Sequence, residues 1–148
     1  MLRVGVLAQA PGGSLTSSAW IRLLLPLRRL ERQGACAVVP LEPAATDDAS
    51  ALVLDGLDRL IVQRAACPTL AQAEALVQAC RQRSLPLILD LDDALFSLPA
   101  EHPERGRYAP AIPALEHLLA AADLRVFSTA TLAAQCESFG PQAVLANG

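Results

Sequence analysis

Lysine is absent from this sequence: all twelve basic residues are arginines, and fifteen acidic residues outnumber them. The formal net charge of −3 gives the chain no broad positive surface, so nucleic acid is not an expected partner. The absence of lysine also counts against functions that use a lysine to balance phosphoryl charge. Arginine is the only permanent side-chain cation that a site in this chain can use.

Long apolar runs and metal-binding patterns are missing as well. No window of about 18 uncharged apolar residues occurs, so the sequence predicts no membrane-spanning helix. The first residues, MLRVGVLAQA, lack the charged and apolar regions of a secretion signal, and the expected location is the cytoplasm. The cysteines have no C-x-x-C spacing and no neighbouring histidine cluster, which predicts buried apolar positions and no metal site for Cys36, Cys67, Cys80 and Cys136.

What the sequence does contain is enough apolar material for one folded domain. The chain has 148 residues, of which 53% are hydrophobic, and this length corresponds to a single domain. Short apolar runs alternate with longer stretches of helical period, an order typical of repeated β-α units. We therefore expect an α/β fold over residues 1–148: a three-layer, Rossmann-like parallel sheet of about six strands flanked by helices.

The alternation also predicts where each element lies. Strands are expected at 3–8, 36–41, 59–64, 85–91, 124–130 and from 142 onward. Helices are expected at 17–34, 69–83, 114–123 and 131–140. Pro26 should kink or split the first helix near residues 23–25, because proline removes a backbone donor and clashes one turn back. Residues 42–52 should form a polar connection, and the proline-rich residues 96–113 a long irregular surface loop.

The stretch LILDLDDALF (87–96) joins a buried strand to three carboxylates. In a parallel α/β sheet the ligand crevice lies outside the carboxyl ends of the strands, where Asp90, Asp92 and Asp93 are expected. Side chains alternate along a strand, so Asp90 and Asp92 should share one face while Leu91 points into a helix layer. These carboxylates are candidates for a phosphatase nucleophile pair, a metal site or a sugar-binding edge.

Three alternatives in this fold class have weak support. The stretch is similar to the nucleophile motif of haloacid-dehalogenase-type phosphatases, but that family places it on its first strand and has threonine or valine where this chain has Ala94. The triplet DLD (90–92) resembles the metal-binding D-x-D of some sugar transferases, although so short a pattern often occurs by chance. A non-enzymatic receiver-like or nucleotide-binding module of flavodoxin topology is the third, and a receiver uses a lysine that this chain lacks.

Motifs along nearly the whole chain resemble the N-terminal half of bacterial two-domain, double-Rossmann (B-type) glycosyltransferases, in the large retaining group that builds surface polysaccharides. The motifs that carry the resemblance are the Arg22-x-x-x-Pro26 helix, the Gln63-Arg64 strand end, the acidic strand end followed by LF-x-LP-x-x-HP, the segment ending in Ser128-Thr129, and the final Asn147-Gly148. They occur here in the same order as in that family.

The resemblance implies an acceptor-side domain of an enzyme that moves a sugar from a nucleotide-sugar to a growing glycan, with no metal or other cofactor. In that family the chain passes at the Asn-Gly into a second, donor-binding domain, so we expect this sequence to be a fragment without transferase activity of its own. The expected partners are that C-terminal domain, a saccharide acceptor and the nucleotide-sugar. A lipid-linked acceptor would also allow peripheral association with a membrane.

Candidate site residues follow from the resemblance and from their places in the chain. Asp92 and Asp93 are the candidates for catalysis, by orienting acceptor hydroxyls or accepting a proton. Arg64 ends the third expected strand at the same edge, and pairing with the aspartates would keep them ionised. The candidates for substrate binding are Gly12, Gly13, Arg22, Arg64, Asp90, His102, Tyr108, Ser128 and Thr129. The glycine pair allows close approach of a ligand to the backbone, and the tyrosine ring can stack on an acceptor sugar.

Overall fold

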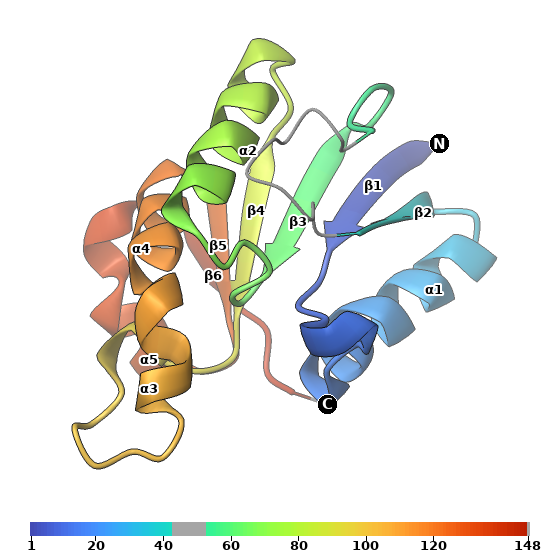
Figure 1. Cartoon of the computed structure of the whole chain (residues 1–148). Helices are drawn as coiled ribbons and strands as arrows, with labels where there is room; N and C mark the ends of the chain where they lie inside the picture. The colour runs from blue at the N-terminus through green and yellow to red at the C-terminus, as the bar shows by residue number, and fades with distance from the viewer. Residues whose placement is uncertain (43–52, 148) are drawn as a thin grey trace.

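The computed structural model describes residues 1–42 and 53–147, and it confirms the expected fold class. Six parallel strands form one sheet in the order β2-β1-β3-β4-β5-β6, with helices on both faces (Figure 1). The strands are β1 (Leu2–Leu7), β2 (Cys36–Leu41), β3 (Arg59–Gln63), β4 (Leu87–Leu91), β5 (Leu124–Phe127) and β6 (Gln142–Val144). Each strand overlaps the range predicted from the sequence.

Each predicted helical range overlaps a helix, and further short helices lie outside these ranges. The longer ones are η2 (Ala19–Leu24), α1 (Leu25–Arg32), α2 (Leu70–Gln82), α3 (Arg105–Tyr108), α4 (Ile112–Ala121) and α5 (Ala130–Gln135). Short 3-10 turns are η1 (Pro11–Gly13), η4 (Leu95–Ser97), η5 (Ala109–Ala111) and η6 (Glu137–Phe139). Helix α2 begins with a capping box in which Thr69 and Gln72 each accept the other's backbone N–H, as the threonine at this position predicts.

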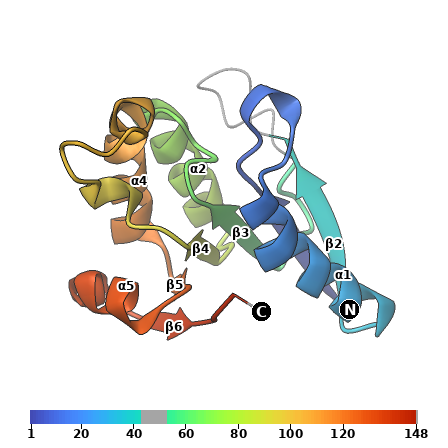
Figure 2. The ribbon, with the colours of Figure 1, turned by 90° about the horizontal axis from the view of Figure 1, so that it is seen from below.

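The direction in which the chain crosses the sheet decides which helices cover which face. From β1 the chain moves to β2 on one side, whereas from β3 to β6 it moves steadily the other way. Connections between parallel strands are right-handed, so η2 and α1 pack on one face while α2 and α4 pack on the other (Figure 2).

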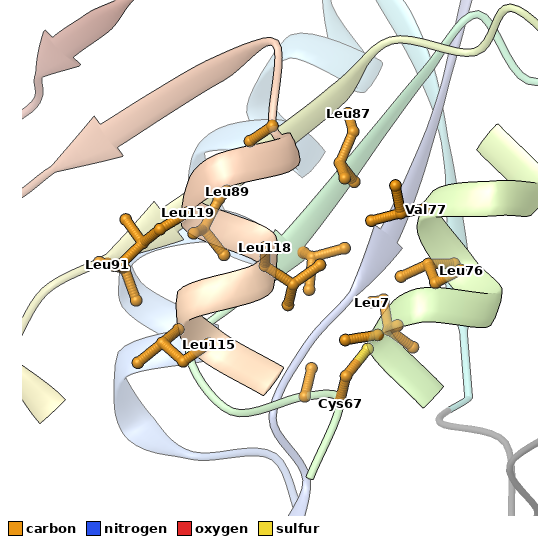
Figure 3. Packing of buried hydrophobic residues seen from close by; sticks show 14 of the residues in the cluster. Leu7, Cys67, Leu76, Val77, Leu87, Leu89, Leu91, Leu115, Leu118 and Leu119 are labelled. Carbon is orange, nitrogen blue, oxygen red and sulfur yellow. The ribbon is translucent and has the colours of Figure 1, made fainter. Parts of the chain in front are cut away.

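Two hydrophobic cores lie on the two faces of the sheet. In the larger one, Leu76 and Val77 of α2 and Leu118 of α4 meet Leu89 and Leu91 of β4 (Figure 3). The smaller one lies beneath the first helix and consists of Val4, Val6, Ala8, Ala19, Leu23, Leu24 and Cys36. Leu91 therefore points into a helix layer, as strand alternation predicts.

A change of helix type accommodates Pro26. η2 is a π-helix, at whose end the N–H of Leu25 donates to the carbonyl of Trp20, and α1 begins at Leu25. Pro26 thus stands in the first turn of α1, directly after the π-helical turn. The helix changes type near residues 23–25, where a kink or split was predicted, but Leu24 and Leu25 keep helical backbone angles and the helix is not interrupted there.

Residues 96–113 are more regular than their proline content predicts. They contain α3 and η5, and α4 begins at Ile112, so the prediction of one long irregular loop is wrong. Pro110 and Pro113 stand in the first turns of η5 and α4, where proline is well tolerated. The connection predicted at 42–52 lies outside the described residues from residue 43 onward. None of the helices described is both long and apolar enough to cross a bilayer.

Candidate functional site

The strand order changes direction at β1 and β3, and the connections that follow these two strands leave toward opposite faces of the sheet. β1 lies between β2 and β3, and the chain leaves β1 toward one face of the sheet and β3 toward the other. In doubly wound sheets ligands bind at this switch point. It lies at the lower edge of the sheet in Figure 1.

Arg22 and Asp90 form a sealed ion pair at this edge. Arg22 Nε donates to Asp90 Oδ2 at 3.1 Å, and Nη2 donates to Oδ1 at 2.7 Å. The two side chains are only 4% and 3% exposed. Arg22 Nη1 also donates to the carbonyl of Leu145 at 3.0 Å and to Asn147 Oδ1 at 2.6 Å. The pair therefore ties η2 and β4 to the C-terminal segment and leaves Asp90 almost out of reach of a ligand.

Burial and charge act against each other in this pair. Burial raises the pKa of Asp90, and the hydrogen bonds and charge of Arg22 oppose that rise. Burial lowers the pKa of Arg22, but its hydrogen bonds to Asp90 and the charges of Asp90 and Asp92 outweigh burial, so its pKa is raised. The two-fold contact is the geometry of a carboxylate with a guanidinium. Loss of one partner would leave the other charge buried and unpaired.

Asp92 lies on the same face as Asp90, as predicted, within a chain of polar side chains. The hydroxyl of Ser18 donates to Asp92 Oδ2, and Gln63 Nε2 donates to Ser18 Oγ at 2.9 Å. Gln63 Oε1 in turn accepts the backbone N–H of Gln9 at 3.3 Å. This chain joins the ends of β1, β3 and β4 to the start of the first helix.

Arg64 meets these carboxylates from the end of β3, as the sequence predicts. Its Nε lies 3.4 Å from Asp92 Oδ1, and its Nη2 lies 3.4 Å from Asp93 Oδ2. Nε and Oδ1 are not aligned for a hydrogen bond, and neither has another partner among the residues described. The backbone of Arg64 is left-handed, with φ 52°, which costs roughly 1–2 kcal/mol for a non-glycine residue. Strain and incompletely bonded polar groups together are typical of functional sites.

Asp93 is more accessible than its neighbour. Its side chain is 61% exposed, against 11% for Asp92. It lines a pocket of about 290 Å³ together with Arg64, His102 and Tyr108. Arg64 Nη2 donates to the hydroxyl of Tyr108 at 3.3 Å, and its guanidinium carbon lies 5.8 Å from the ring centroid. The pocket therefore combines an open carboxylate, a cation and an aromatic ring.

A second hollow also has Tyr108 in its wall. Its volume is about 220 Å³, and its lining includes Gln9, Arg107 and Tyr108. The guanidinium of Arg107 lies 5.7 Å from the tyrosine ring centroid, and the buried Oε1 of Gln9 has no hydrogen-bond partner in the described part of the chain. Gly12 and Gly13 form the adjoining η1 turn with positive φ and open space around them. The close backbone approach predicted for this turn is sterically open.

The remaining predicted site residues have local structural partners. Ser128 is buried and donates through Oγ to the carbonyl of Asp92 at 2.8 Å. Thr129 Oγ1 accepts a backbone N–H of α5 at 3.1 Å and so caps that helix. His102 Nδ1 accepts a backbone N–H within its own turn at 3.1 Å, while its side chain lines the Asp93 pocket. The site thus centres on Arg64, Asp93 and Tyr108, with Ser128 and Thr129 supporting its rim.

Three members of the polar chain, Ser18, Gln63 and Gln9, were not predicted as site residues. Gln63 carries a readable signal, because a fully buried amide at the end of an apolar strand is unusual, and its register places it opposite Asp90 on β4. Ser18 carries none. It contacts Asp92 across 74 positions of sequence only because η2 packs against that face of the sheet.

This geometry limits the chemistry open to the aspartates. A phosphatase nucleophile must be reachable, whereas Asp90, the first aspartate of the motif, is sealed against Arg22. A D-x-D metal site would use Asp90 and Asp92 together, yet each carboxylate already faces an arginine. Over residues 1–42 and 53–147 no cluster of three or more potential metal ligands is found. The group that the edge presents to a ligand is the Asp93 carboxylate.

The first five strands have the order of flavodoxin-like sheets, and sheets of this kind carry many unrelated functions. Comparison with models of known protein families and with curated protein sequences found no match to this chain. The chemistry of the site and the motifs in the sequence are therefore what indicate a function.

Proposed function

We propose that this chain is the acceptor-side domain of a two-domain glycosyltransferase, which moves a sugar from a nucleotide-sugar to a growing glycan. The observation that carries the proposal is the open carboxylate of Asp93 beside Arg64 and Tyr108, in a pocket at the carboxyl edge of a parallel sheet. The resemblance of motifs along the chain supports the same function, including transfer from a nucleotide-sugar to a glycan.

Asp93 is the group that contacts the acceptor in this proposal. Arg64 lies 3.4 Å from its carboxylate. Asp93 accepts a hydrogen bond from the attacking hydroxyl and takes up its proton, while that oxygen bonds to the donor sugar and the bond from the sugar to the diphosphate breaks. Asp92 does not contact the acceptor in this proposal but positions Arg64. Ser18 holds Asp92, which faces Arg64 Nε and fixes the guanidinium between the two carboxylates.

The acceptor sugar lies against Tyr108. A sugar ring has an apolar face that packs on an aromatic ring, while its hydroxyls reach the polar groups around that ring. Here those groups are Asp93, His102 and Arg64. The hollow beyond the tyrosine, lined by Gln9, Arg107 and Tyr108, has room for the next sugar of the acceptor.

The donor diphosphate is held by a second domain in this proposal. In the family that the sequence resembles, that domain follows the Asn147-Gly148 pair, and it provides the charge stabilisation of the leaving group. The bonds from Arg22 to Leu145 and Asn147 fix the direction in which the chain reaches that pair. The sealed ion pair then sets the geometry between acceptor site and donor domain.

The parent gene tests the division into two domains. The sequence downstream of Gly148 should encode a second Rossmann-like domain with an acidic donor-binding motif. A stop codon at that point would contradict the proposal, because the diphosphate would then have no binding half.

Ligand titration tests the chain itself. Calorimetric titration with UDP-, GDP- and TDP-sugars should show no binding, because half a cleft leaves the diphosphate facing water. Titration with neutral oligosaccharides should shift the backbone amide signals of Arg64, Asp93 and Tyr108. Asp93→Asn should reduce those shifts, and Glu116→Gln, which changes an exposed carboxylate on α4, should not. Micromolar binding of a nucleotide-sugar to this chain alone would overturn the proposed division of roles.

A further inference from the structure

The hollow beyond Tyr108 differs in chemistry from the pocket around Asp93. Its volume of about 220 Å³ is below the usual range for a drug-sized ligand, so it suits one sugar or a substituent of a sugar. Arg107 is the one charged residue in its described lining. Most of the lining is small and apolar, and consists of Ala10, Pro11, Ala65, Ala66, Pro68 and Ala111. Ring hydroxyls placed against such a wall lose their hydrogen bonds with water and gain none.

Gln9 brings one buried amide to this apolar wall. The residue lies two positions after β1 and is only 8% exposed. Its backbone N–H donates to Gln63 Oε1 at 3.3 Å, which fixes the residue at the sheet edge. Its side-chain amide makes no hydrogen bond with any residue that the structure describes. Buried amides nearly always have partners, so a group that enters the hollow can supply the one that the described chain does not.

The Gln9 amide is suited to a partner that both donates and accepts. The torsion before a glutamine amide is broad and roughly two-fold, and turning this amide breaks no hydrogen bond with a described residue. The amide therefore presents its oxygen to a donor or its nitrogen to an acceptor. A hydroxyl would satisfy it as well, but a hydroxyl has no apolar part for the alanines and prolines. An acetamido group has an N–H, a carbonyl and a methyl group, and so matches both features of the hollow.

We propose that the hollow binds the acetamido group of an N-acetylated sugar in the acceptor, next to the sugar that lies in the Asp93 pocket. The methyl group packs on the alanine and proline side chains, and the amide of the sugar forms a hydrogen bond with the amide of Gln9. Tyr108 stands in the walls of both pockets and separates the two sugars. This inference rests on the proposed sugar transfer, and it names the class of acceptor: a glycan whose next-to-last residue is an N-acetylhexosamine.

Two disaccharides of the same linkage test the acetamido group alone. N,N′-diacetylchitobiose and cellobiose differ only in carrying an acetamido group or a hydroxyl at carbon 2 of each ring. In NMR titrations both should shift the Asp93 signal, whereas only diacetylchitobiose should shift the side-chain amide of Gln9 and the methyl group of Ala65. Its affinity should be at least about tenfold higher, the usual contribution of a small apolar group in an apolar pocket. Saturation transfer from the protein should be strongest at the acetyl methyl protons.

Variants test the hollow from the side of the protein. Gln9→Leu removes the amide and should bring the affinity for diacetylchitobiose close to that for cellobiose, with cellobiose binding unchanged. Ala65→Leu narrows the hollow at a half-buried position and should have the same effect with the amide still present. The matched control is Gln78→Leu, which removes an exposed amide on α2 and should bind like the parent. Thermal melts of all four proteins check that each is folded.

The outcomes separate this inference from the proposed transfer. Equal affinity for the two disaccharides, with the Asp93 signal moving in both titrations, would overturn the acetamido site and leave the transfer standing. Shifts at Gln9 and Ala65 without one at Asp93 would support the acetamido site and contradict the role given to Asp93. No binding of either disaccharide would overturn both. A loss in Gln78→Leu as large as that in Gln9→Leu would also overturn the inference, because the loss would then not depend on the hollow.

Discussion

Two arginine–aspartate groups lie a few residues apart at the same sheet edge and have opposite surroundings. Arg22 and Asp90 are sealed from water and joined by two aligned hydrogen bonds. Arg64 faces Asp92 and Asp93 at 3.4 Å without such alignment, and Asp93 is largely open to solvent. Residue type alone does not separate a structural ion pair from a binding site. Burial and hydrogen-bond geometry do.

The two arginine–aspartate groups also differ in how they affect the free energy of unfolding. In the sealed pair burial penalises both charges and each partner offsets part of that cost, so removing one charge leaves the other buried and unpaired. The open group carries backbone strain at Arg64 and polar atoms without full hydrogen bonding. Backbone strain and buried polar atoms without partners cluster at functional sites. Substitutions in the two groups should therefore have different consequences, and those consequences test the contrast.

The largest effect is expected at the sealed pair. Asp90→Asn leaves the Arg22 charge buried with a neutral partner, so the free energy of unfolding should fall by about 3–5 kcal/mol. Urea denaturation followed by circular dichroism measures this loss. The double substitution Arg22→Met/Asp90→Leu removes both charges and should cost much less than the single one. If Asp90→Asn is as stable as the parent, the pair is not the structural element described here.

An intermediate effect is expected at Asp92. Asp92→Asn weakens the bond from Ser18 and removes a charge that faces Arg64, which should lower stability by about 1–2 kcal/mol. Ser18→Ala should cost a similar amount, and the double variant should cost less than the sum, because both changes break the same contact. Additive losses in this double-mutant cycle, measured by urea denaturation, would show that the two side chains act separately.

A small effect on stability is expected at Asp93. Its side chain is mostly exposed and its contact with Arg64 is screened, so Asp93→Asn should change the free energy of unfolding by less than about 0.5–1 kcal/mol. Thermal melting of this variant beside Asp90→Asn compares the open and sealed groups in one experiment. Similar melting temperatures for the two variants would remove the distinction between them.

The smallest effect is expected at the buried cysteines, whose thiols burial makes unreactive. Burial raises the pKa of the Cys67 thiol to about 12 and that of Cys80 to about 11, and it also raises the pKa of Cys136. At pH 8 these thiols are therefore protonated and poor nucleophiles. The folded chain should react with dithionitrobenzoate only as fast as it unfolds, and four thiols should react at once in guanidinium chloride. Rapid labelling at pH 8 would show that these thiols are accessible.

Local patterns were enough to predict most of the fold. Alternating apolar runs identified the strands, Thr69 identified the start of α2, and Pro26 identified the place where the first helix changes type. The segment from 96 to 113 was mispredicted because proline in the first turn of a helix and proline in a loop look alike in sequence. Such a distinction depends on which carbonyls the neighbouring N–H groups reach.

The site was predictable only in part. Arg64, Asp92 and Asp93 stand at strand ends, and parallel strands bring their carboxyl ends together, so their proximity follows from topology. Topology does not predict that Asp90 is buried in an ion pair while Asp93 is exposed, because this difference depends on the packing of Arg22 from a different element. Ser18 was unpredictable for the same reason. Long-range contacts between polar side chains leave no periodic signal in the sequence.

The most direct test of the central claim is the rate of sugar transfer by a protein that joins this domain to its donor-binding half. Asp93→Asn should lower turnover about a hundredfold, the usual contribution of a positioned acid–base group, while the melting temperature stays within a degree or so of the parent's. Glu116→Gln, in the same protein, should change neither quantity. Full turnover by the Asp93→Asn enzyme would show that the open carboxylate is not the acceptor site.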